Sequence, residues 1–325
     1  MKQKLKTSLS KTKTLLLIST LLIFLGALSC IFGEFILPFL TATLAVLYLF
    51  DGSKHRVLSI SVSVLLLIIN VAGFIAVKTV SLFAPASIIL AFIICFSFCK
   101  GESKADAAYI MTIIAAIFSL LMYVLYAMVD QGEYTLDAVK VFYTDFYDSL
   151  RTLIVDSFMS VYSTSGLAVT EEMIIALFDR QVSMIISYLL IGGFMVVGIA
   201  MKLFSFVVSR LLEDKSAILQ WRFSTTNLFA YFYLILTLAS VFVINADGIF
   251  AISILNLYNV FLIVFAYVGF NFVITHIFKN LRPLYAGLIL VAIMLVFSGF
   301  AVQVLAILGV MHTIRSNKNN RIQNS

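Results

Sequence analysis

The sequence predicts an all-α fold, a polytopic transmembrane bundle of about 8–10 helices with extracytoplasmic amphipathic helices. Hydrophobic residues make up 62% of the 325-residue chain, and its mean hydropathy is +1.10. The charged residues gather in short clusters between long apolar runs. Because a helix needs roughly 20 apolar residues to cross a bilayer, these runs favour membrane-spanning helices. They are continuously apolar rather than alternating, which argues against the strands of a membrane barrel.

Five helices are expected in the N-terminal region, residues 1–129. Lysines precede the first apolar run, which we interpret as an uncleaved helix because a second run follows almost at once. Glu34 and Pro38 divide these two runs into a tight helical hairpin, and Lys78 divides the third helix from the fourth. The expected helices occupy about 14–33, 35–50, 57–77, 79–98 and 107–129.

Residues 130–181 have a charge balance unlike that of the other polar segments. They include nine acidic and three basic residues, whereas the other loops are mostly basic. Because basic residues mark the cytoplasmic side, we expect an extracytoplasmic segment and a cytoplasmic N-terminus. Thr170, followed by Glu171 and Glu172, predicts the start of a short helix. A longer amphipathic helix is predicted by apolar residues at helical spacing, namely Val139, Phe142, Phe146, Leu150, Leu153, Phe158 and Tyr162.

The C-terminal region, residues 182–314, is expected to hold helices over about 182–208, 225–244 and 249–275. The last apolar stretch, 284–311, is longer than one span requires. A bend near Ser298 and Gly299 would make two short helices and keep the polar tail, residues 315–325, in the cytoplasm. One tilted helix would place the tail outside. We favour the hairpin, because it puts most of the 22 Lys and Arg residues on the cytoplasmic side.

The amphipathic segment supplies the first candidate ligand-binding residues. Tyr143, Tyr147, Asp148 and Arg151 combine aromatic faces with a charge pair, which suits a small organic ligand. The segment would then act as a lid over an outward-facing cavity. The alternative, which amphipathicity alone favours, is an interfacial cap that seals the bundle and binds no ligand.

A second candidate group lies within a predicted membrane helix. Asn256, Tyr258 and Asn259 bring hydrogen-bonding groups to the span over 249–275, and polar residues in the membrane often mark a transport path. They either line a cavity or join neighbouring helices through hydrogen bonds. Close helix contacts are also expected at small residues, among them Gly192, Gly193 and Gly198.

The sequence contains no pattern of a P-loop, a zinc protease or an intramembrane protease, so we expect no enzyme, no catalytic residue and no cofactor. The net charge of +6 reflects basic cytoplasmic loops rather than nucleic-acid binding. We expect no metal site. Cys95 and Cys99 lie one helical turn apart, and His55, His276 and His312 lie in or beside basic loops, as surface residues near lipid headgroups do.

Two short segments carry a resemblance to a known family. Leu219-Gln220-Trp221-Arg222-Phe223 opens a helix after a charged loop, and Leu305 to Gly309 precedes Arg315 near the C-terminus. In these segments the chain resembles the YybS-like family of bacterial membrane proteins (domain of unknown function 2232). That family is similar to the substrate-binding components of energy-coupling-factor transporters, which bind vitamins and depend on separate ATPase subunits. The resemblance implies a solute-binding bundle and supplies no ligand residues.

Two hypotheses for function result. The leading one is a bundle in the bacterial plasma membrane that binds or moves a small solute and takes any energy from an ATPase partner subunit. The rival is a non-transporting scaffold that recruits membrane partners in envelope growth or sporulation. The expected partners are the lipid bilayer, a small solute and other subunits, and not nucleic acid.

Overall fold

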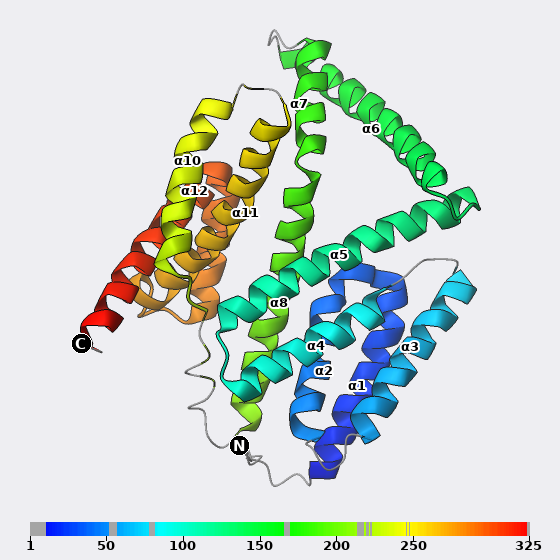
Figure 1. Ribbon diagram of the computed structural model, residues 1–325, viewed down its shortest axis with the longest axis vertical. Helices are drawn as coiled ribbons and strands as arrows, with labels where there is room; N and C mark the ends of the chain where they lie inside the picture. Colours follow the sequence, from blue (N-terminus) through cyan, green and yellow to red (C-terminus); the bar gives the residue numbers. More distant parts are fainter. Residues whose placement is uncertain are drawn as a thin grey trace. The chain divides into compact units, whose positions relative to one another are not determined.

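The computed structural model describes residues 11–51, 57–77, 82–165, 170–212, 223–244 and 248–323, together with 218, 221 and 246. All regular elements within these residues are helices (Figure 1), which confirms the predicted all-α fold. The chain forms two compact units. Unit 1 contains residues 1–102, 107–185 and 192–220, and unit 2 contains residues 103–106, 186–191 and 221–325.

Unit 1 begins with the predicted helical hairpin. The short 3₁₀-helix η1 (Gly33–Phe35) separates α1 (Lys11–Phe32) from α2 (Leu37–Asp51). Gly33 has a φ of 54°, a left-handed conformation that other residues rarely adopt. Pro38 lies in the first turn of α2, where its missing N–H costs no intrahelical hydrogen bond. The hairpin is followed by α3 (Val57–Val77) and α4 (Phe83–Lys100).

The core of these four helices forms around α2. Leu40, Leu44 and Leu47 are fully buried on one face of α2, at the spacing that places residues on the same side of a helix. α2 packs against α1 and against α4, where Leu90 and Ile94 are fully buried. α3 exposes most of its large apolar side chains instead, as a helix that faces lipid does.

Four more helices continue the chain, namely α5 (Lys104–Gln131), α6 (Leu136–Ser165), α7 (Glu171–Ser183) and α8 (Ile185–Leu211). The predicted long amphipathic helix is α6, which Figure 1 shows between the end of α5 and α7. The predicted start of the second helix is confirmed, because the Thr170 hydroxyl accepts a hydrogen bond of 3.3 Å from the Met173 N–H.

Close helix contacts were expected at three glycines of α8, and the structure shows one at Gly193. A Cβ at Gly193 would lie 2.9 Å from the Thr112 carbonyl oxygen, so the backbones of α5 and α8 approach closely there. Among the described residues, Gly192 and Gly198 have open space beside them. The prediction of a close contact is therefore wrong for these two, because they lie on other faces of α8.

Unit 2 is built around α11 (Ile249–Phe272), which continues into a π-helical turn, η2 (Val273–Ile277). α10 (Asn227–Val243) and α12 (Pro283–Gln323) pack against α11. The glycines of α11 and α12 meet, since a Cβ at Gly269 would overlap the Leu305 carbonyl and one at Gly309 would overlap the Phe265 carbonyl. The buried cluster contains Ala230, Tyr233, Phe265, Ala266, Val273, Leu290, Leu305, Ala306 and Val310.

α12 is one uninterrupted helical run of 41 residues. Ser298 and Gly299 lie within this run, so no break in the helical backbone separates the two helices predicted there. The run still changes direction. If α12 ran straight back along α11, Leu305 would lie roughly 20 Å past Gly269, which it touches. Figure 1 shows the orange and red halves of α12 as separate limbs.

Five helices within the described residues are long and apolar enough to cross a membrane. Four shorter apolar helices, of 10–17 residues each, accompany them. The chain is therefore a multi-pass membrane protein, as predicted. The five candidate spans are Phe83–Lys100, Lys104–Gln131, Ile185–Leu211, Ile249–Ile277 and Gly299–Ser316.

Candidate functional site

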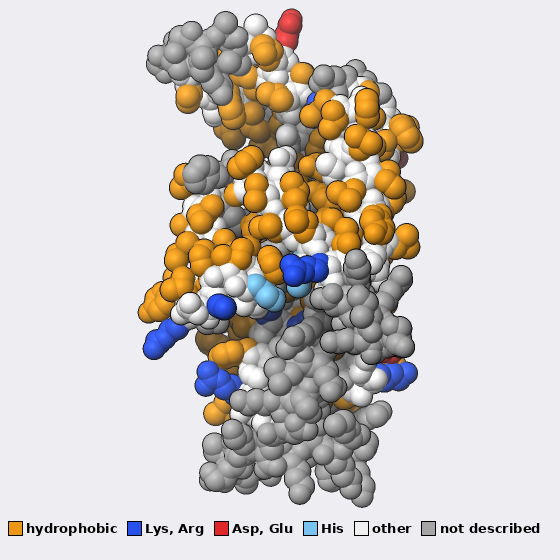
Figure 2. Space-filling view, turned by 90° about the vertical axis from the view of Figure 1, so that its left-hand side faces the viewer, with side chains coloured by type: hydrophobic (Ala, Val, Ile, Leu, Met, Phe, Trp, Pro, Cys, Tyr) orange, Lys and Arg blue, Asp and Glu red, His pale blue; other side chains and the backbone are white. Residues whose placement is uncertain are grey.

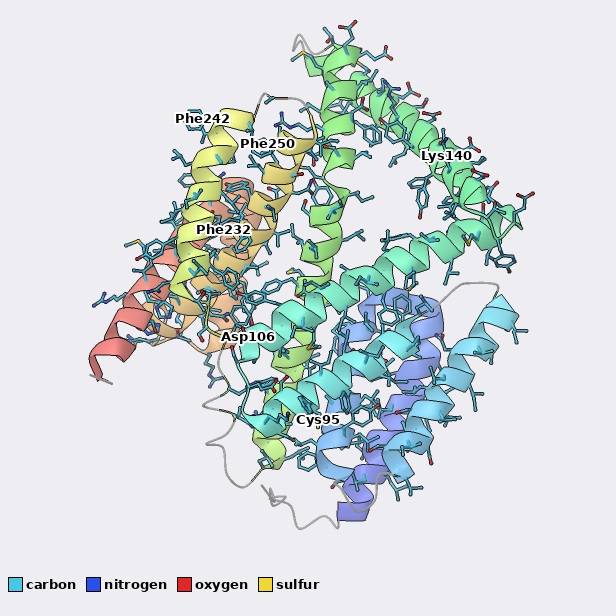
Figure 3. The ribbon with its side chains drawn as sticks, in the orientation of Figure 1. Cys95, Asp106, Lys140, Phe232, Phe242 and Phe250 are labelled. Carbon is cyan, nitrogen blue, oxygen red and sulfur yellow. The ribbon has the colours of Figure 1, made fainter. Side chains whose placement is uncertain are left out.

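An open groove of about 430 Å³ follows one face of α6. Lys140, one turn after the first residue of α6, lies on this face (Figure 3). The spacing of the groove residues by three or four positions places them on one side of the helix. The groove thus combines an apolar floor, two phenols and an ammonium group. Its lining residues are Leu136, Val139, Lys140, Tyr143, Thr144 and Tyr147.

Two buried polar atoms on this side of α6 have no hydrogen-bond partner within the part of the chain that the structure describes. They are the Tyr143 hydroxyl and the Arg151 Nε. Tyr143, Tyr147 and Arg151 follow one another at intervals of four residues, so they form a continuous stripe along the helix. Buried polar atoms are nearly always paired, so each exception calls for a partner such as water, an ion or a ligand.

α7 completes one end of the stripe. The Tyr147 hydroxyl donates a hydrogen bond of 2.5 Å to Asp179 Oδ1, and its ring contacts the buried Phe178 ring at 5.2 Å between centroids. These contacts hold α6 against α7 and fix the position of the Tyr147 ring. Sequence reasoning missed Asp179. Its only local signal is its place on the predicted short helix, which does not show that this helix faces Tyr147.

Both phenols are held in the neutral form. The hydrogen bond to the Asp179 carboxylate is the main cause that raises the pKa of Tyr147, because the carboxylate stabilises the protonated phenol. Burial is the main cause that raises the pKa of Tyr143. The positive charges near this part of the groove come from Lys140 and Arg151. The groove is therefore lined by two tyrosines and one cationic residue, Lys140, and Arg151 follows on the same side of the helix.

Asp148, the fourth candidate residue on α6, is placed differently. Its side chain is exposed and does not line the groove. The sequence grouped it with Arg151, three positions further along the helix, as a charge pair. Relative to Tyr147, however, Asp148 is one position along, and one position rotates a side chain by about 100°. Asp148 therefore lies on another face than Tyr147, and the structure brings together three of the four residues.

The candidates on α11 have structural contacts. Asn256 is buried, its Nδ2 donates to the Ile252 carbonyl at 2.9 Å, and its Oδ1 accepts from the Ser187 backbone N–H at 2.9 Å. Ser187 lies in the first turn of α8, where backbone N–H groups have no partner within the helix. Asn256 therefore caps the beginning of α8 from a neighbouring helix. This contact agrees with the packing interpretation of the intramembrane asparagines.

Tyr258 packs against the buried cluster of unit 2. The Tyr258 ring stacks on the buried Tyr233 ring of α10, with 6.0 Å between centroids and an interplanar angle of 9°. Asn259 is half-buried and engaged in an interaction of its own. The structure thus gives the three α11 candidates neighbours within the protein.

No group of three or more His, Cys, Asp or Glu side chains within the described residues could hold a metal ion. Cys95 and Cys99 are free thiols on α4. His55, the histidine in the first basic loop, lies outside the described residues.

Comparison with known proteins identifies the family. Neither the curated proteins nor the solved structures contain a match to the chain. The family described as "Predicted membrane protein (DUF2232)" matches residues 17–312, which include all five candidate spans except the last few residues of the fifth, together with the α6 groove. The all-helical, multi-pass architecture agrees with that description. This chain therefore belongs to the DUF2232 family of predicted membrane proteins.

Proposed function

We propose that the protein binds a small organic solute in the α6 groove, at the outer surface of the bacterial plasma membrane. The observation that carries this proposal is the pair of unpartnered buried polar atoms, Tyr143 Oη and Arg151 Nε, on the side of α6 that forms the groove. A ligand with hydrogen-bonding groups would satisfy both atoms, and a folded protein rarely leaves such atoms unpaired.

The chemistry of the groove restricts the solute. Leu136 and Val139 provide apolar surface, and the Tyr143 and Tyr147 rings provide aromatic faces. Lys140 and Arg151 provide positive charge. This combination favours a small molecule with an apolar or aromatic body and one acidic group, because small-molecule sites pair apolar walls with a few placed polar groups.

The location of the groove follows from charge. The segment from residue 130 to 181 is acidic, while the loops on the other side of the predicted spans are basic, so the positive-inside rule places α6 outside and the N-terminus in the cytoplasm. A reporter fused after Ser163 is expected to give an extracytoplasmic signal. A cytoplasmic signal would reverse the orientation and contradict this part of the proposal.

We assign no catalytic step and no cofactor to this site. If the protein moves its solute, a separate ATPase subunit supplies the energy, as the resemblance to substrate-binding components of energy-coupling-factor transporters implies. Asn256 and Tyr258 make packing contacts within the protein. We therefore expect the solute contacts on α6 rather than on α11.

Mass spectrometry of small molecules that co-purify with the protein in mild detergent tests the proposal. We expect one compound to be enriched with the wild-type protein and to be lost from a variant with Tyr143→Phe and Arg151→Gln. Asp148→Asn is the matched control, since Asp148 lies on the same helix but outside the groove. The proposal is wrong if the double variant retains the compound as well as the wild type does. It is also wrong if no compound is enriched with folded wild-type protein.

A second candidate function is a membrane scaffold in envelope growth or sporulation. It is favoured by the large apolar side chains that α6 exposes, among them Leu136, Phe146, Leu153 and Val161, although α6 is not a candidate span. Crosslinking from Leu153 in intact cells would decide between the functions. A single protein partner, with no solute in the groove, supports the scaffold.

A further inference from the structure

Two histidines from different elements of unit 2 lie side by side. His276 belongs to η2 and His312 belongs to α12, and their ring centroids are 5.6 Å apart. The Phe272 ring lies 4.8 Å from each of them, at interplanar angles of 26° and 31°. His276 is exposed and His312 is half-buried. An aromatic side chain thus supports two imidazoles that a ligand can reach from outside.

The hydrogen bonds of Thr275 determine which nitrogen of His276 is available. The Thr275 hydroxyl donates its proton to the Asn271 carbonyl at 2.8 Å, and it lies 2.8 Å from His276 Nδ1. Because a hydroxyl has one proton, a Thr275 hydroxyl that donates to the carbonyl accepts from Nδ1 of His276. Nε2, on the other side of the ring, is therefore the atom that can meet a ligand.

The backbone around His276 is unusual. The Phe278 N–H donates to the Val273 carbonyl at 2.9 Å, five residues back, as in a π-helix. Single π-helical turns are rare and are found frequently at functional sites, because they disturb regular helix geometry. Here the turn ends α11 at the place where His276 meets His312.

The surroundings of the two rings are basic. Lys279 follows His276 by three residues, and Arg315 follows His312 by three residues on the same face of α12. Figure 2 shows the pale-blue histidines beside blue basic side chains, at the edge of a hydrophobic surface. The segments assigned to unit 2 contain two acidic residues in sequence, Asp106 and Asp247.

We infer that His276 and His312, with Lys279 and Arg315 three residues further along the chain from each, form a binding site for a phosphate group where unit 2 leaves the membrane. The imidazoles donate hydrogen bonds in their charged form, and the lysine and arginine add positive charge. This basic environment favours an anion over a metal cation. The phosphate belongs either to an anionic lipid headgroup or to a free phosphate compound, because both present the same oxygens.

The test uses the full-length protein purified in detergent. Native mass spectrometry measures the retention of phosphatidylglycerol and phosphatidylcholine, and calorimetry measures the binding of inorganic phosphate. The variants are the double substitution His276→Gln and His312→Gln, and the single substitution Arg315→Gln at an exposed position. Lys100→Gln is the matched control, because Lys100 is also a basic residue at a helix end beside an aromatic ring, Phe96.

We expect retention of phosphatidylglycerol, or binding of inorganic phosphate, to fall about tenfold in the double variant and less in Arg315→Gln. Lys100→Gln is expected to behave as the wild type. Loss confined to the lipid identifies a headgroup site, and loss confined to inorganic phosphate identifies a site for a free phosphate compound. If Arg315→Gln and a folded double variant keep both, or if Zn²⁺ and not phosphate stabilises the wild type, the inference is wrong.

Discussion

α6 and α11 both carry tyrosines and polar residues at helical spacing, but the two helices use them differently. On α11, Asn256 hydrogen-bonds to the first turn of α8 and Tyr258 stacks on Tyr233. On α6, the Tyr143 hydroxyl and the Arg151 Nε are buried without a hydrogen-bond partner. On α11 the hydrogen-bonding capacity of these polar residues is used in packing, whereas on α6 two polar atoms are left without a partner among the described residues.

The largest expected effect tests how tightly α11 is packed. Gly269→Ala would place a methyl group on the Leu305 carbonyl, and a backbone atom cannot move aside as a flexible side chain can. We expect the free energy of unfolding to fall by about 2–3 kcal/mol. Thermal unfolding of the purified protein in detergent measures this change.

Gly287→Ala is the matched control for that variant. Gly287 lies on α12 with open space beside it, and alanine favours a helix by up to about 1 kcal/mol over glycine. An unchanged or higher Tm is expected for this control. If Gly269→Ala were equally harmless, the close contact between α11 and α12 would be absent in the protein.

The second prediction concerns Asn256. Asn256→Ala would leave the Ser187 N–H buried in the first turn of α8 without its partner, and we expect a loss of about 1–2 kcal/mol. Ser253→Ala, on the same helix, removes a hydroxyl that bonds only to the Ile249 carbonyl, and it is expected to change stability by less. The two Tm values are compared in one detergent. Equal values would show that Asn256 is available for another role.

Sequence alone predicted the features that depend on local chemistry. The cap at Thr170 was predictable because a cap is a relation between neighbours in the chain. The shared face of Tyr143, Tyr147 and Arg151 was also predictable, because helical periodicity determines it. The place of Asp148 outside the groove could not be predicted, because the sequence does not show which face of α6 lines the groove.

Contacts between distant segments were not predictable in this way. Asn256 and Ser187 are 69 positions apart, and their hydrogen bond depends on how α11 packs on α8. Asp179 meets Tyr147 only because α7 folds against α6. The bend expected near Ser298 and Gly299 leaves the helical run of α12 unbroken, while the two halves of α12 form separate limbs.

The third prediction concerns the hydrogen bond between α6 and α7. Tyr147→Phe removes the donor to Asp179, and we expect a loss of about 1 kcal/mol, because the acceptor is charged but near the surface. The raised pKa of Tyr147 also gives a sign for the pH dependence. The stabilisation is fully present below the ordinary tyrosine pKa of about 10 and is lost as pH rises through the higher folded value.

The free energies of unfolding of the wild type and of Tyr147→Phe are measured between about pH 8 and pH 11, a range that includes the ordinary tyrosine pKa. Their difference checks the sign of the pH dependence. The difference in the free energy of unfolding between the wild type and Tyr147→Phe should be constant at the lower pH values and become smaller at the alkaline end of the range. A difference that grows with pH would contradict the hydrogen bond as described.

The smallest effect on stability is expected for Tyr143→Phe. This variant tests most directly whether polar residues on α6 and on α11 have different roles. The Tyr143 hydroxyl is buried without a partner, so its removal relieves a desolvation cost rather than a bond, and the Tm should stay the same or rise slightly. Retention of the co-purifying solute should fall nevertheless, because the hydroxyl would then be missing from the groove. A lower Tm with unchanged retention would mean that the hydroxyl serves packing, as Asn256 does on α11, and would remove the reason to place a ligand on α6.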